Sequence, residues 1–139
     1  MVNITTLGAR ERQRAIAIAV GIYVALVLGT LVALGILSAT APHLATQDAW
    51  VHAVIVGVFA VVLPLRLRAA ARSGGPGALR PVGIIAAVLF LVNVVEVLIP
   101  GLFPMWMRVE MIGIAVVMLA VILLVFGERV GAQEGRGTT

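Results

Sequence analysis

Four long apolar runs, separated by short polar or Pro/Gly-containing breaks, occupy most of this chain. They lie at about 15–38, 50–65, 82–99 and 109–127. A helix that crosses a bilayer needs roughly 20 mostly apolar residues, because the hydrocarbon core is about 30 Å thick. Each run reaches or approaches that length. We therefore expect an all-α, polytopic membrane protein with one domain over residues 1–139, built as an up-down bundle of four transmembrane helices at about 14–38, 50–71, 80–99 and 105–127.

The composition supports the membrane assignment and excludes several functional classes. Hydrophobic residues make up 62% of the chain and charged residues 12%, whereas soluble domains carry about 25% charged residues. The net charge of +4 does not indicate nucleic-acid binding, because the arginines flank the apolar runs and form no patch among aromatic residues. Cysteine is absent, which excludes a disulfide framework, a thiolate nucleophile and a Cys-based metal site. We expect no cofactor and no nucleic-acid partner.

The arginines predict how the chain is oriented in its membrane. All ten basic residues are arginine, and nine of them lie in the two terminal regions or between the second and third runs. Only Arg108 lies on the other side. Because basic residues accumulate on the cytoplasmic side, both short termini are predicted to be cytoplasmic. Exclusive use of arginine, with abundant Ala, Val and Gly, suggests a bacterial protein, and hence the cytoplasmic (inner) membrane.

Three of these arginines, Arg66, Arg68 and Arg72, follow the second run closely. Basic side chains at this depth reach anionic lipid headgroups, at about 1 kcal/mol each. We therefore name them as candidate headgroup contacts. The alternative is that they only set the topology.

Small residues recur every four positions along the first predicted helix, where they form one stripe: Ala17, Gly21, Ala25, Gly29 and Ala33. The second helix has a shorter version, Ala53 and Gly57. Such stripes let helix backbones approach closely in lipid, where hydrophobicity alone does not bring helices together. One interpretation is an interface with a second copy or another membrane protein. The other is packing against the chain's own helices.

The two halves of the chain share a few landmarks. Arg14 and Gly35 align with Arg80 and Gly101 at one offset, while Trp50 and Gly57 align with Trp106 and Gly113 at a shorter one. Two helical hairpins with the same orientation would form a parallel repeat about an axis along the membrane normal. Two tandem hairpins are therefore one possible architecture.

Polar residues within membrane helices are candidates for function, and most of those in this chain gather near the predicted outer ends of the helices. The candidate set is Thr30, His52, Asn93, Glu96, Arg108 and Glu110. One hypothesis is a structural ion pair between Glu96 and Arg108. Another is a pocket in which Glu96 binds a proton or cation and His52 tunes it. A metal site has no compact ligand spacing to support it, and no catalytic constellation is evident.

Three functions are compatible with this pattern. The first is a non-enzymatic accessory or scaffold subunit that assembles through its small-residue faces. The alternative is an oligomeric small transporter or channel that uses the polar site around Glu96. The third is a membrane enzyme that acts on a lipid or a quinone.

Overall fold

The computed structural model describes the backbone of residues 4–75 and 77–136, and the side chains of residues 8, 10–75 and 77–127. Its elements are helices: α1 (Ile4–Thr40), a short 3-10 turn η1 (Pro42–Leu44), α2 (Gln47–Ser73), α3 (Arg80–Leu98) and α4 (Met105–Arg136). The all-helical prediction is confirmed for the described residues. α1 begins earlier and α4 ends later than expected, because their polar flanks contain arginine, glutamate and glutamine, which are good helix formers.

Each of the four α-helices contains a segment that is long and apolar enough to cross a membrane: Arg10–Thr40, Gln47–Ser73, Arg80–Leu98 and Met105–Gly127. Their outward faces carry large apolar side chains, and Leu98, Met105 and Val109 are each more than 60% exposed. Soluble monomers rarely expose extensive apolar surface. This surface suits contact with membrane lipid.

Specific residues end the helices and begin the next ones. The Thr46 hydroxyl accepts a hydrogen bond from the Ala49 N–H at 3.2 Å and so caps the start of α2. Gly74 ends α2 in the left-handed conformation, with φ of 59°, which glycine adopts without steric cost. Gly101 provides a second positive φ, 78°, between α3 and α4. The short breaks between the apolar runs are therefore turns, formed by a capping threonine and by glycines with positive φ.

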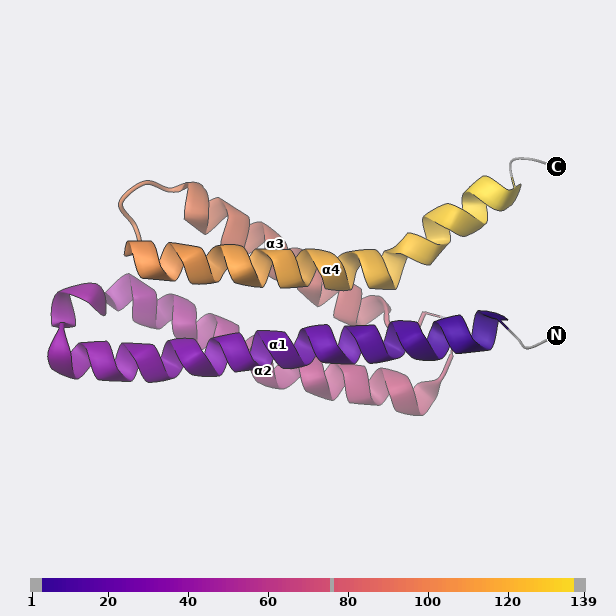
Figure 1. The fold of residues 1–139 in the computed structure, drawn as a ribbon, viewed down its shortest axis with the longest axis horizontal. Helices are drawn as coiled ribbons and strands as arrows, with labels where there is room; N and C mark the ends of the chain where they lie inside the picture. The colour runs from indigo at the N-terminus through magenta and orange to yellow at the C-terminus, as the bar shows by residue number, and fades with distance from the viewer. Residues whose placement is uncertain (1–3, 76, 137–139) are drawn as a thin grey trace.

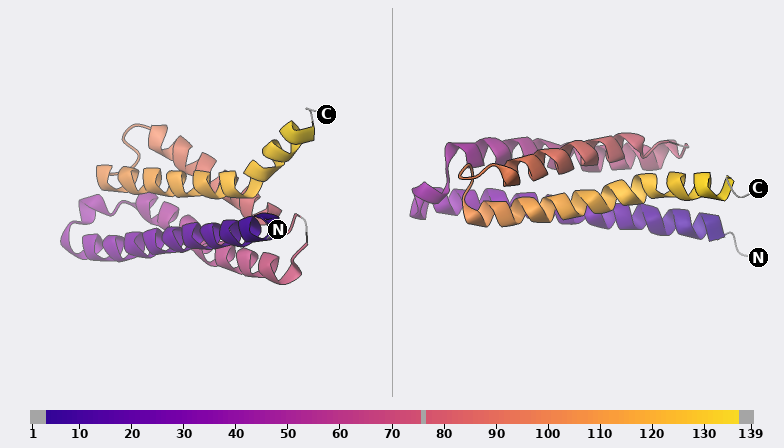
Figure 2. Two further views of the ribbon diagram at one scale, coloured as in Figure 1. Left: turned by 45° about the vertical axis from the view of Figure 1, so that its right-hand side comes forward. Right: turned by 90° about the horizontal axis from the view of Figure 1, so that it is seen from above.

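Figure 1 shows the four helices side by side, with the start of α1 and the end of α4 at the same end of the molecule. α1 packs against α2 and α4, and α3 packs most extensively against α4, whereas α2 and α3 touch only slightly. The further views in Figure 2 show the same elongated arrangement. The helix pairs α1–α2 and α3–α4 are therefore joined mainly through α1 and α4.

Buried apolar side chains form two clusters along the length of the molecule. The larger one includes Tyr23, Val56, Leu89 and Met118. The smaller one, near the helix connections opposite the termini, includes Leu34, Phe103 and Met107. Thr30 and His52, two of the buried polar side chains, each lie between a residue of the larger cluster and a residue of the smaller one on the same helix. Apolar packing therefore encloses them from both ends.

Candidate functional site

Polar side chains from all four α-helices meet inside the molecule. We call this set the polar cluster: Thr30 on α1, His52 on α2, Asn93 and Glu96 on α3, and Glu110 on α4. The side chains of Thr30, His52 and Asn93 are almost completely buried. Five of the six predicted candidates therefore belong to one region. Polar groups within membrane helices are costly unless they are partnered. The partner of each side chain in the cluster therefore matters.

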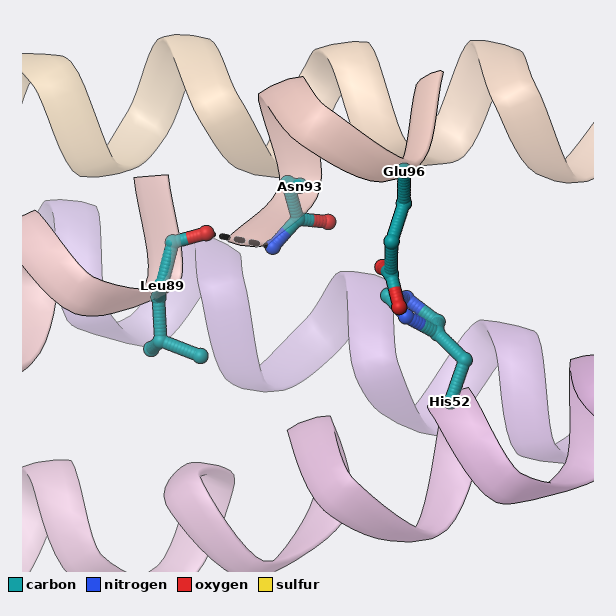
Figure 3. A network of polar contacts seen from close by, with 4 residues as sticks. All are labelled: His52, Leu89, Asn93 and Glu96. Atoms are coloured by element: carbon teal, nitrogen blue, oxygen red, sulfur yellow. Dashed lines mark hydrogen bonds and ion pairs between the residues drawn. The ribbon is translucent and has the colours of Figure 1, made fainter. Parts of the chain in front are cut away.

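The closest contact joins His52 and Glu96. Figure 3 shows Glu96 reaching from α3 to the imidazole ring of His52 on α2, and His52 Nδ1 lies 2.6 Å from Glu96 Oε2. The His52 side chain is 1% exposed and the Glu96 side chain 21% exposed. The contact therefore brings an imidazole and a carboxyl group together inside the helix bundle.

Apolar packing closes the surroundings of His52. Its ring meets the ring of Phe103 edge-on, with centroids 5.6 Å apart and planes at 62°. Phe103 lies in the connection between α3 and α4 and is itself buried. The second ring nitrogen, His52 Nε2, is buried and has no hydrogen-bond partner. His52 therefore contacts Glu96 through Nδ1, while its Nε2 has no hydrogen-bond partner.

Asn93 lies one helical turn from Glu96 on the same side of α3. Its Nδ2 donates to the Leu89 carbonyl oxygen at 2.7 Å, as Figure 3 shows. Its Oδ1 is buried without a hydrogen-bond partner. Asn93 therefore presents a free acceptor beside the His52–Glu96 pair.

Glu110 adds a second carboxyl group from α4. Both of its carboxyl oxygens are buried without a hydrogen-bond partner, and the group interacts electrostatically with His52 and Glu96. The Thr30 hydroxyl is adjacent, but it donates its proton to the Leu26 carbonyl oxygen at 2.9 Å and cannot also donate it to Glu110. A groove of about 460 Å³ between α1 and α4 runs over Thr30 and Glu110.

Arg108 forms no ion pair with Glu96, so the hypothesis of a structural Glu96–Arg108 pair is wrong. Arg108 Nη2 donates to the Val97 carbonyl oxygen at 2.7 Å. The last carbonyls of a helix lack intrahelical partners, and a cationic side chain satisfies them. Arg108 therefore caps the end of α3, while His52 is the partner of Glu96.

Tyr23 on α1 belongs to the surroundings of the cluster. Its hydroxyl donates to the Val56 carbonyl oxygen at 2.6 Å, linking α1 to α2, and it interacts electrostatically with Glu110. The side chain is completely buried. The clue available from the sequence was that a buried tyrosine needs a hydrogen-bond partner.

No group of three His, Asp or Glu side chains that could hold a metal ion occurs among the described residues. The other histidine, His43, is exposed in η1, away from the buried ring of His52. The polar cluster contains one imidazole, from His52, and two carboxyl groups, from Glu96 and Glu110.

The predicted small-residue stripe on α1 lies largely on the outside of the chain. Ala17, Gly21, Ala25 and Gly29 are exposed, and Ala33 is partly buried. On α2, Ala53 is completely buried and Gly57 is partly buried. The close helix contact within the chain is instead at Gly83 on α3, where an added Cβ would lie 2.5 Å from Phe126.

Comparison with known protein families, curated proteins and solved structures finds no match to this chain. Function depends on the site rather than on the fold class. The most informative residues are those of the polar cluster.

Proposed function

We propose that the protein is a small bacterial inner-membrane transporter that works as an oligomer and couples transport to proton binding at the polar cluster. The observation that carries this proposal is the 2.6 Å contact between His52 and Glu96 within the membrane-crossing segments. Buried titratable groups in a membrane mark proton relays and ion pathways. A purely structural pair would not require the second carboxyl group of Glu110 nearby.

Charge accounting supports proton binding. The cluster carries two negative charges when His52, Glu96 and Glu110 are all deprotonated, and it is neutral when two protons are bound. Net charge is costly to bury in a membrane. Binding and release of a proton therefore change the stability of the surrounding helix packing, which is the requirement for coupling a proton to a conformational change.

The proposed orientation follows from the two ends of the molecule. The end with Arg66, Arg68 and Arg72 is assigned to the cytoplasm, with both termini. The opposite end carries Trp50 and Trp106, whose indole nitrogens donate to Ser38 Oγ at 3.2 Å and to the Leu44 carbonyl oxygen at 3.3 Å. Tryptophan at a membrane interface supports this up-down arrangement. Trp50 is the fourth residue of α2 and Trp106 the second residue of α4. Each therefore lies in the first turn of its helix, as two tandem hairpins would have it.

A second candidate function is an accessory or scaffold subunit. The observation that favours it is the exposed stripe on α1, where a Cβ added at Gly21 or Gly29 would meet no atom within 4 Å. A helix of another protein, or of a second copy, fits against such a face. Four helices alone rarely enclose a transport pathway, so the same face also serves the oligomer required by the first candidate.

The decisive experiment compares proton binding and proton flux in reconstituted protein. Infrared difference spectra between a low-pH and a high-pH state should contain a carboxyl C=O band that Glu96→Gln or Glu110→Gln removes. In sealed vesicles, wild type should carry protons down a pH gradient, and Glu96→Gln should reduce the flux at least tenfold. Asp48→Asn, at an exposed acid on the same end, is the matched control and should behave like wild type.

Two results would redirect the assignment. Flux that is unchanged in Glu96→Gln would remove the polar cluster from the mechanism. Proton binding without flux, together with a defined complex with other proteins in native mass spectrometry, would favour the accessory-subunit function.

A further inference from the structure

A long groove runs between α1 and α2 on the half of the molecule that carries the termini. It has a volume of about 680 Å³, and its lining includes Gln13, Ala17, Val20 and Gly21 from α1 and Pro64 and Arg68 from α2. Val20 is buried beneath it, while Ala17 and Gly21 are exposed. The small side chains on α1 leave the space open, because a Cβ added at Gly21 would meet no atom within 4 Å.

The length of the groove corresponds to one leaflet of a bilayer. Along α1 it extends from Gln13 to Val24, and at about 1.5 Å per residue this is roughly 16 Å. Half of a hydrocarbon core of about 30 Å is about 15 Å. An extended lipid acyl chain therefore fits along the groove from the charged end to the middle of the membrane.

The charged end of the groove continues into a basic hollow. Arg68 and Arg72 line an adjoining groove of about 520 Å³, and Leu65 and Arg68 belong to both. The two arginines are four residues apart, so they lie on one face of α2. Neither forms an ion pair with the side chains that the structure describes.

Arg66 differs from its neighbours. It is exposed like Arg68 and Arg72 and lies on the same helix end, but it lines neither groove. Residues two positions apart on a helix point to nearly opposite sides. The three predicted headgroup contacts therefore separate into two groove arginines and one outside the groove.

We propose that this α1–α2 groove is a specific binding site for one anionic phospholipid of the cytoplasmic leaflet. An acyl chain lies along the apolar part between Gln13 and Val24, and the phosphate lies between Arg68 and Arg72. Guanidinium groups bind phosphate through paired, charge-assisted hydrogen bonds. This site shares no residue with the polar cluster, although Ala17 and Gly21 also belong to the small-residue stripe on α1.

The apolar groove and the basic hollow at its end together identify the molecule that would bind there. An apolar groove that ends in two uncompensated arginines matches a molecule with a long apolar part and an anionic end. A helix of a partner protein would bury the apolar surface but leave the arginines without phosphate. A zwitterionic phospholipid supplies the chain but places its own cation beside the arginines, which weakens the binding.

Native mass spectrometry of the protein released from nanodiscs of mixed phosphatidylglycerol and phosphatidylcholine tests the proposal. Wild type should retain one phosphatidylglycerol in preference to phosphatidylcholine. Arg68→Gln and Arg72→Gln should each reduce this retention about fivefold, which corresponds to about 1 kcal/mol. Arg66→Gln, which removes the same charge from the same helix end, is the matched control and should retain the lipid.

A second pair of variants tests the acyl-chain part. Gly21→Leu should fill the groove and reduce retention of both lipids, whereas Gly35→Leu, at an exposed glycine elsewhere on α1, should not. Equal loss in Arg66→Gln and Arg68→Gln would mean that attraction to the charged end is diffuse, and it would overturn the proposal. Equal retention of phosphatidylglycerol and phosphatidylcholine by wild type would overturn it as well.

Discussion

His52 on α2 and Glu96 on α3 meet at 2.6 Å across the helix pair that has the slightest packing among neighbouring helices. The other neighbouring pairs, α1–α2, α1–α4 and α3–α4, have more extensive contacts. A polar contact therefore joins the two helices where apolar packing is sparse. Because polar contacts can form and break with protonation, the proposed proton binding would act on this side of the bundle.

The His52–Glu96 pair should appear as an energetic coupling. We expect Glu96→Met and His52→Leu each to destabilise the protein, because each leaves a buried group without its partner. The double variant should be more stable than the sum of the two changes predicts, with a coupling of about 1–3 kcal/mol. Reversible unfolding in mixed micelles measures it. Strictly additive effects would show that the contact contributes nothing to stability.

Substitution of Glu110 by methionine should change the stability of the protein in the opposite direction from Glu96→Met. Both of its carboxyl oxygens are buried without a hydrogen bond, and such a group costs about 1–3 kcal/mol. Glu110→Met, which keeps an unbranched side chain, should therefore raise the stability while abolishing the proton response, as expected for a functional residue that is retained at a cost. Unfolding of Glu110→Met beside Glu96→Met checks this, and destabilisation of both variants would contradict it.

Phe103 should control access to His52. The chain has two histidines: His43 is exposed and His52 is 2% exposed beneath Phe103. We expect diethyl pyrocarbonate added to intact vesicles to modify His43 rapidly and His52 slowly. Phe103→Ala should make His52 reactive and leave the modification of His43 unchanged. Peptide mass spectrometry distinguishes the two sites, and rapid modification of His52 in wild type would mean that this end of the bundle is open.

Gly83 should tolerate substitution far less than the glycines of the predicted stripe. A Cβ at Gly83 would lie 2.5 Å from Phe126 and 2.8 Å from Val125, so Gly83→Ala should cost about 1–3 kcal/mol through overpacking. Gly29→Ala meets no atom within 4 Å and should be neutral or slightly stabilising, because alanine favours the helix by about 1 kcal/mol. Thermal unfolding of both variants provides the comparison, and equal stabilities would argue against a tight α3–α4 contact.

Part of the polar cluster could be predicted from residue type and part could not. His52, Glu96, Asn93, Thr30 and Glu110 stand out in the sequence because polar groups are rare within apolar helices. Their pairing does not follow from spacing, since Glu96 and Arg108 are close along the chain, yet Arg108 caps α3 instead. Which partner a side chain meets depends on the rotation of each helix about its axis, which spacing alone leaves open.

The small residues illustrate the same limit. A four-residue period identifies a stripe on α1, but it does not say what the stripe faces, and within the chain most of it is exposed. Gly83, which lies outside this stripe, is the described glycine at which an added Cβ would clash with a neighbouring helix. The contact requires one glycine at one crossing point, and a crossing point is a property of two helices together.

The sequence alone determined that this chain forms four long apolar helices joined by short turns, because the length and polarity of each segment decide whether it can cross a bilayer. It also determined which end carries the arginines. Only the tertiary structure decided that His52 meets Glu96, that Glu110 remains unpartnered and that Arg68 and Arg72, but not Arg66, line a groove. These facts depend on how the helices are packed and rotated against one another, and many rotations bury similar apolar area.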